Sequence, residues 1–212
     1  SAASDVYKRQ DFDKSEIMPL IKNSVPSVIQ QSIPAISTTF LTALVSGYGI
    51  SAIAGYGVTG KLETILFHPA MALNMVLTSI VGQCIGGKRI DRAKDYLKLS
   101  LKYGSITLII LSLIIIVFSK QLAGLFVASE NVAVIVNQYF TIVSIGYVLY
   151  TITSCCLGTL NGLGKPTRSM ILMIFYYIVI RIPLAYIFAS LGSDLTGIWF
   201  AILILSLIHI SE

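Results

Sequence analysis

Charged side chains are scarce in this sequence. Asp, Glu, Lys and Arg together make up 12% of its 212 residues, which is about half the share usual in a soluble domain. Hydrophobic residues make up 55%, and the mean hydropathy is +0.83. This balance excludes an ordinary soluble globular domain and indicates a chain that folds in the lipid bilayer.

Residues that bind metals or form disulfides are also few. The chain has two histidines and three cysteines. Cys84, Cys155 and Cys156 all lie within or at the edge of apolar stretches, with no spacing typical of a metal site or of a secreted disulfide framework. We therefore expect no metal site and no cofactor, and we interpret the cysteines as small apolar residues.

The sequence contains instead six apolar stretches, each close to the roughly 20 residues that a helix needs to cross the hydrocarbon core. They cover approximately residues 24–46, 64–86, 101–119, 132–157, 169–191, and 195 onward. Backbone polar groups in lipid must be satisfied within the segment, so spans of this length are helices. The predicted fold is an all-α membrane protein, a bundle of six transmembrane helices.

Basic residues fall mainly on one side of these spans. Ten lie before the first span, between the second and third, or between the fourth and fifth: Lys14, Lys22, Lys88, Arg89, Arg92, Lys94, Lys98, Lys102, Lys165 and Arg168. The opposite side has only Lys61 and Lys120. Because basic residues near span ends stay in the cytoplasm, we predict a multi-pass protein with both ends cytoplasmic. The net charge of +5 is then a topology signal, and we expect membrane lipids, and no nucleic acid, as partners.

Two short motifs suggest other functions, and their context argues against both. "SIVGQCIGGKR", residues 79–89, approaches a phosphate-binding loop, but it has Arg89 where a hydroxyl residue is needed and follows a membrane helix, not a strand. "VSGYG" (45–49) and "IAGYG" (53–57) are similar to the filter of potassium channels but have no re-entrant pore helix. We expect no enzyme and keep an ion channel as an alternative of a different class.

Polar residues inside the spans mark the expected binding site, because such residues in lipid are functional candidates. The first span is the richest in them and is expected to face a cavity or another helix. The predicted substrate-binding residues are Gln30, Gln31, Thr38, Asn74, Tyr147, Tyr150 and Thr151.

Three other residues are expected to act structurally inside the membrane. Pro34 bends the first span. Arg181 lies near the middle of the fifth span, and Pro183 lacks the amide that would bond the carbonyl of Val179. Freed carbonyls or lipid phosphates are the expected partners of Arg181, because the sequence predicts a membrane interior without carboxylates.

Three segments resemble one known family. They are "MALNMVLTSIVGQCIGGKRIDRAKDYL" (71–97), "LGTLNGLGKPTRSM" (157–170), and "IRIPLAY" followed by "LTGIW" (180–199). Their order and spacing resemble the multidrug and toxic compound extrusion (MATE) transporters over residues 14–204. Members of that family have twelve helices in two six-helix lobes around a central cavity, and they export cationic or amphipathic compounds in exchange for Na⁺ or H⁺.

The resemblance implies that this chain is the C-terminal lobe of a bacterial plasma-membrane exporter, with the missing N-terminal lobe as its partner. The first, second and fourth spans would then line the cavity. NorM-like members hold carboxylates in the first and fourth helices of this lobe, but residues 17–62 and 131–193 contain no Asp or Glu. The coupling Na⁺ or H⁺ is therefore expected in the missing lobe, as in the DinF-like branch. A flippase of lipid-linked oligosaccharides, from the same superfamily, is the alternative that Arg181 favours.

Both ends of the chain depart from this pattern. "SAASDVYKRQ" at the start and "SLIHISE" at the end are similar to translated sequencing adapters. We expect a non-native or disordered leader at 1–12, the six-helix lobe at 13–205, and a non-native tail at 206–212.

Overall fold

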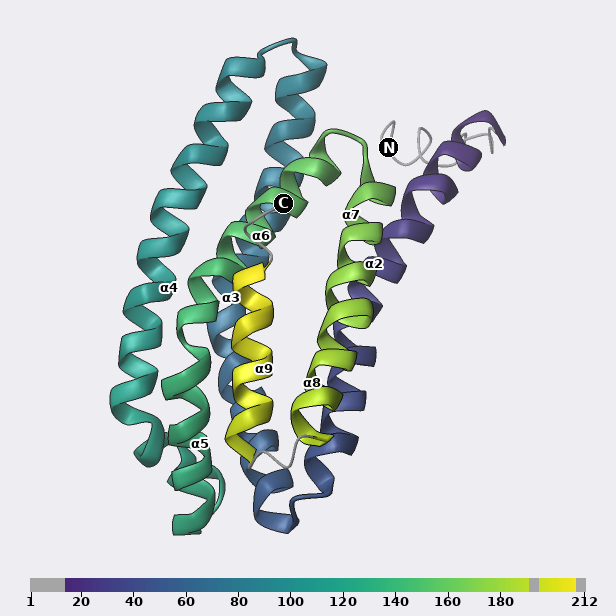
Figure 1. Ribbon diagram of the computed structural model, residues 1–212. Helices are drawn as coiled ribbons and strands as arrows, with labels where there is room; N and C mark the ends of the chain where they lie inside the picture. The colour runs from purple at the N-terminus through teal and green to yellow at the C-terminus, as the bar shows by residue number, and fades with distance from the viewer. Residues whose placement is uncertain (1–13, 191–194, 209–212) are drawn as a thin grey trace, which may run out of the picture.

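The computed structural model describes residues 14–190 and 195–208, and every regular element in these residues is a helix (Figure 1). In chain order the elements are α2 Lys14–Ser46, α3 Ile50–Gly86, α4 Ile90–Phe126, α5 Glu130–Val143, α6 Ile145–Gly162, α7 Pro166–Ile174, the π-helix η1 Phe175–Ile180, α8 Arg181–Ser190 and α9 Leu195–Ile208. The predicted all-α bundle is confirmed. The expected leader, and part of the expected tail, lie outside the described residues.

Among the described residues, four helical stretches are long and apolar enough to cross a membrane: Ile17–Ser46, Ile50–Gly86, Ile90–Phe126 and Pro166–Ser190. The fourth predicted span, residues 132–157, is not one straight helix, since α5 and α6 meet at an angle of 56°. The break falls at Ser144, two residues before Gly146, and a Ser/Gly pair is a common cause of a sharp kink. The amide of Tyr147 bonds the carbonyl of Ser144 at 3.1 Å, a tighter turn than that of an α-helix.

Helix α3 begins 14 residues before the predicted second span. It follows Gly49, whose φ of 100° favours glycine, and it includes the second "GYG" motif together with Lys61 and Glu63. Glu63 lies 13 residues into the helix, roughly 20 Å along its axis. The predictions that Lys61 lies in a connector and that the apolar spans hold no carboxylate are therefore wrong. Both residues line a cavity, so neither has to face lipid.

The closest helix contact is between α3 and α6. A Cβ atom at Gly158 would lie 2.5 Å from the carbonyl oxygen of Asn74, and one at Gly162 would lie 2.8 Å from that of Thr78. The two glycines are four residues apart, so they lie on one face of α6 and let the two backbones approach. The Asn74 side chain also donates to the carbonyl of Ser154 at 2.8 Å. Hydrogen bonds and close packing thus hold α3 and α6 together.

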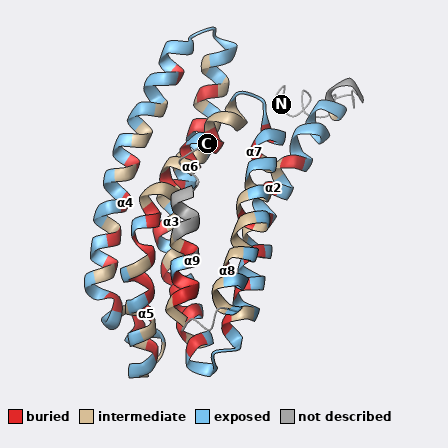
Figure 2. Cartoon of the chain, in the orientation of Figure 1, coloured by how far each residue is buried: buried red, intermediate tan, exposed pale blue. Residues whose placement is uncertain are grey.

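Buried residues gather on α3, α5, α6 and α9, whereas α2, α7 and α8 carry few (Figure 2). In α2 the buried residues from Gln30 to Val45 recur every three or four positions and form a narrow stripe. This helix packs against α7, η1 and α8. In α8 the one described residue that is buried is Ala185. The molecule therefore consists of a densely packed group and a thinner group of helices.

Candidate functional site

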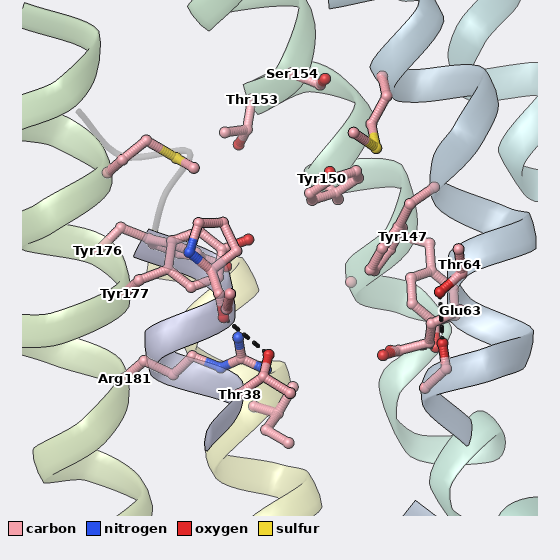
Figure 3. Close-up of a pocket in the computed structure, with 18 of the residues that line it drawn as sticks. Thr38, Glu63, Thr64, Tyr147, Tyr150, Thr153, Ser154, Tyr176, Tyr177 and Arg181 are labelled. Atoms are coloured by element: carbon pink, nitrogen blue, oxygen red, sulfur yellow. Dashed lines mark hydrogen bonds between the residues drawn. The ribbon is translucent and has the colours of Figure 1, made fainter. Parts of the chain in front are cut away.

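A cavity of about 650 Å³ lies between these two groups of helices (Figure 3). Helices α3 and α6 form one wall of the cavity. The opposite wall comes from α2 and from the segment that runs through α7, η1 and the start of α8. Residues of the first, second, fourth and fifth predicted spans line this cavity.

Six of the seven predicted substrate-binding residues line this cavity: Gln30, Gln31, Thr38, Asn74, Tyr147 and Tyr150. Their role in binding stays a prediction. Thr151 is the exception, because its side chain is fully buried and turned toward α4. Its hydroxyl donates to the carbonyl of Tyr147 at 3.2 Å, and its methyl group lies beside Gly104. Thr151 is therefore not placed to contact a molecule in the cavity.

Two of the three residues predicted to act structurally also line the cavity. Pro34 and Arg181 do so, and Pro183 does not. The π-helix η1 ends directly before Arg181, where Pro183 supplies no amide to the carbonyl of Val179. The buried hydroxyl of Ser37 donates to the carbonyl of Tyr177 at 3.1 Å and ties this turn to α2. The local departure from α-helix thus fixes the position from which Arg181 projects.

Glu63 is the main feature that the sequence analysis missed. Its side chain is half-buried in the cavity wall. The hydroxyls of Tyr139 and Tyr147 both donate to its Oε1 atom, at 2.6 and 2.9 Å. Within the described residues the other oxygen, Oε2, accepts no hydrogen bond. Two donors on one oxygen stabilise a carboxylate anion and leave the second oxygen free for another ligand.

An aromatic cluster holds these two tyrosines in place. Tyr139 and Tyr147 are 1% and 2% exposed. Tyr139 packs edge-on against Trp199, with ring centroids 4.8 Å apart, and Tyr56 stacks on the same indole at 5.8 Å. Offset and edge-on aromatic pairs of this kind add to the stability that burial alone gives. The hydroxyls are therefore directed at Glu63 by a rigid part of the core.

The wall formed by α2 is polar in a different way. The hydroxyls of Thr38 and Thr42 donate to carbonyls four residues earlier in the same helix, at 2.9 and 2.8 Å. This satisfies the hydroxyl hydrogens and leaves their oxygens able to accept hydrogen bonds. The side-chain oxygen of Gln30 is buried and finds no partner among the described residues. This wall therefore offers hydrogen-bond acceptors to a bound molecule, and the acceptors carry no negative charge.

Arg181 projects into the cavity from the side opposite Glu63 (Figure 3). Its guanidinium group lies 5.3 Å from the centre of the Tyr177 ring, a cation–π distance. Tyr176, Tyr177, Phe67 and Tyr150 add aromatic surface to the cavity. The described residues include no group of three His, Cys, Asp or Glu side chains that could hold a metal ion. The cavity thus combines aromatic surface with a carboxylate and a guanidinium group.

Comparison with known proteins agrees with this geometry. The MatE family model matches residues 26–187. A protein of Shewanella oneidensis named FAD transporter is 28% identical over 138 residues, which are 65% of this chain and 30% of that protein. A probable multidrug resistance protein NorM of Bacillus cereus is 23% identical over 142 residues, 66% of this chain and 31% of that protein.

The fold matches a solved transporter as well. The crystal structure of the Vibrio cholerae MATE transporter VcmN in the bent form aligns with a TM-score of 0.86 and 22% identity, over 96% of this chain and 46% of that one. The chain thus spans about a third of the length of the curated relatives it matches and less than half of the solved structure. With three quarters of its residues inside the family match, the chain belongs to the MATE family of membrane transporters, which are not enzymes.

Proposed function

We propose that this chain is the C-terminal six-helix lobe of a secondary active exporter of cationic or amphipathic compounds. A second six-helix lobe, at the amino-terminal side, would close the cavity, and alternating access would arise as the two lobes rock about it. The multidrug names of several relatives and the coverage of less than half of a solved transporter support this proposal.

The exporter would lie in a bacterial plasma membrane with both ends of this chain in the cytoplasm. The basic turn between α3 and α4, around Lys88 and Arg89, supports this orientation. A reporter that works only in the cytoplasm should be active when fused at that turn, and a reporter that works only in the periplasm should be inactive there. A periplasmic signal there would contradict the orientation.

Glu63 is the coupling residue that this half of the transporter offers. The observation that carries this step is the pair of tyrosine hydroxyls on its Oε1 atom. A single carboxylate with phenolic neighbours suits a proton better than a metal cation, which needs more oxygen ligands. Binding and release of H⁺ at the free oxygen would change the charge of the cavity wall during each cycle. Na⁺ and a site in the other lobe, as the sequence analysis expected, remain the rivals.

The test measures export from proteoliposomes by a transporter in which this chain is completed by a first six-helix lobe. Glu63→Gln removes the titratable group and keeps the shape of the side chain. Proton-driven export of ethidium should fall about tenfold or more, since a hydrogen bond to a charged group contributes about 1.5–3 kcal/mol. Glu130→Gln is the matched control, because Glu130 is exposed at the start of α5 and far from the cavity lining.

The outcomes separate the rivals. If Glu63→Gln left coupled export intact while removal of the acids of the first lobe abolished it, coupling would reside in the missing lobe. Loss of export only when a Na⁺ gradient was removed would favour Na⁺ over H⁺.

The position within the family also remains a proposal. A DinF-like placement is supported by the absence of Asp and Glu from residues 17–62 and 131–193, whereas several relatives carry the name NorM. A lipid-linked oligosaccharide flippase is supported by Arg181 alone. The ion channel loses its support, because the second "GYG" motif is part of helix α3 and not of a filter loop.

A further inference from the structure

Arg181 is a cation in the cavity wall without a matching anion. It is half-buried at the first position of α8. In the part of the chain that the structure describes it forms no ion pair, and its Nε atom is buried without a hydrogen-bond partner. The nearest aromatic group, Tyr177, covers the guanidinium at 5.3 Å and supplies no negative charge.

The carboxylate of the same cavity does not fill this role. Glu63 accepts its two hydrogen bonds from Tyr139 and Tyr147, and no ion pair joins it to Arg181 among the described residues. Figure 3 shows the two side chains entering the cavity from different walls. Withdrawing the charge of Arg181 from water without a partner raises the free energy of the folded protein, and a bound anion would lower it.

We propose that Arg181 binds the oxyanion, a carboxylate or a phosphate, of the exported compound. The planar guanidinium offers parallel N–H donors that match the two oxygens of such a group. This inference rests on the proposed export function and narrows its substrates. Among the exported compounds, those that carry an acidic group as well as an apolar or aromatic body should bind most tightly.

The rest of the cavity fits the body of such a compound. The rings of Phe67 and Tyr150 lie 4.2 Å apart and face the cavity from α3 and α6. Tyr176 and Tyr177 border Arg181. A planar ring system attached to the oxyanion can therefore pack against tyrosine and phenylalanine faces on both walls while its acidic group reaches Arg181.

Lys61 is the competing cation of the cavity. It lines the same space but its side chain is exposed, and a hydrated ammonium on a flexible stem binds an oxyanion less selectively than a half-buried guanidinium. The two residues therefore have to be tested separately.

The experiment compares two dyes that differ only at one group. Tetramethylrhodamine carries a free carboxylate, and its methyl ester does not. Binding of each dye to the 212-residue chain in uncharged detergent is followed by fluorescence anisotropy, with no ion gradient. The free acid should bind about tenfold more tightly than the ester, as expected for a charge-assisted pair.

Substitutions assign this preference to a residue. Arg181→Gln should abolish the preference for the acid over the ester. Arg168→Gln makes the same change in the exposed first turn of α7 and should leave the preference intact. Arg181→Lys keeps the charge and should retain a reduced preference for the acid. If Arg181→Gln does not elute from size exclusion as a folded protein, the size of the preference in Arg181→Lys tests the proposal.

Three results would overturn the proposal. They are no preference for the acid in the unmodified chain, a preference of undiminished size in both Arg181→Gln and Arg181→Lys, and a preference that is lost in Lys61→Gln instead. A lipid headgroup as the occupant is a separate outcome. In nanodiscs, addition of phosphatidylglycerol to phosphatidylcholine would then erase the preference, and the oxyanion would belong to the membrane and not to the cargo. Dye binding is measured without an ion gradient and coupled export with one, so loss of export in Glu63→Gln and loss of the dye preference in Arg181→Gln are separate results.

Discussion

The two walls of the cavity are built on opposite principles. In the packed wall, formed by α3 and α6, backbones meet at glycines and side chains bond across the interface. In the open wall, formed by α2, η1 and the start of α8, the hydroxyls of Thr38 and Thr42 donate to their own helix, and Arg181 has no counter-ion among the described residues. One wall holds its groups in fixed positions, whereas the other leaves groups available to a ligand.

This difference indicates a division of labour. A coupling group has to respond to a cation with a defined geometry, and Glu63 is held by tyrosines of the packed core. A wall that meets varied amphipathic compounds gains from unfilled hydrogen-bonding capacity and a thin packing layer. Changes in the packed wall should therefore affect folding or coupling, and equivalent changes in the open wall should not.

The largest effect is expected where the two backbones meet. Gly158→Ala would place a methyl group 2.5 Å from the carbonyl oxygen of Asn74, which only a shift of the helices can relieve. The free energy of unfolding should fall by about 1–3 kcal/mol. Thermal unfolding of the detergent-solubilised chain, followed by circular dichroism, measures this loss.

Gly57→Ala is the matched control. Gly57 lines the cavity in α3, and a Cβ atom there would meet nothing within 4 Å. Since glycine inside a helix is about 0.5–1 kcal/mol less favourable than alanine, this variant should be unchanged or slightly more stable. Equal destabilisation by both substitutions would show that the contact between α3 and α6 is no more tightly packed than the cavity face of α3.

A smaller effect is expected from loss of one donor to Glu63. Tyr147→Phe keeps the ring in the core and removes one of the two hydroxyls on Oε1. Coupled export should slow by about tenfold, because a hydrogen bond to a charged group contributes about 1.5 kcal/mol or more. Proteoliposome export measures the change.

Tyr150→Phe provides the comparison within the same helix. Tyr150 lines the cavity and keeps its ring contact with Phe67 whether or not it has a hydroxyl. Its export rate should stay within about twofold of the unmodified transporter, as for a substitution that leaves other partners in place. A larger loss in Tyr150→Phe than in Tyr147→Phe would argue against Glu63 as the coupling group.

The sequence predicted the helical class, most of the span positions and six of the seven cavity residues it proposed, because long apolar runs and the polar residues inside them are strong signals in lipid. It missed Glu63, since the glycines and Lys61 before it lower the local hydropathy and suggest a connector. A helical signal was nevertheless present. Gly60, Glu63, Phe67, Met71 and Asn74 follow one another at three or four residues, and all of them line the cavity.

Other features depend on contacts that no local pattern contains. Thr151 turns toward α4 because Gly104 leaves room for its methyl group, and that glycine is 47 positions away in the sequence. The break at Ser144 interrupts a run that is apolar on both sides. That Arg181 and Glu63 line one cavity without forming an ion pair, among the residues the structure describes, is visible only in the folded arrangement.

The smallest expected effect concerns single hydrogen bonds in the two walls. Asn74→Ala removes the bond from its side chain to the carbonyl of Ser154 across the packed wall, and such bonds between membrane helices contribute about 0.6 kcal/mol, at most about 2. Thr38→Ala removes a bond within α2 alone and should change the unfolding free energy by less than about 0.5 kcal/mol. Both residues line the same cavity, and their hydrogen bonds differ in the helix that supplies the acceptor. If Thr38→Ala lowered the melting temperature as much as Asn74→Ala did, hydrogen bonds across the packed wall would add nothing to its rigidity, and close packing at Gly158 and Gly162 would have to account for all of it.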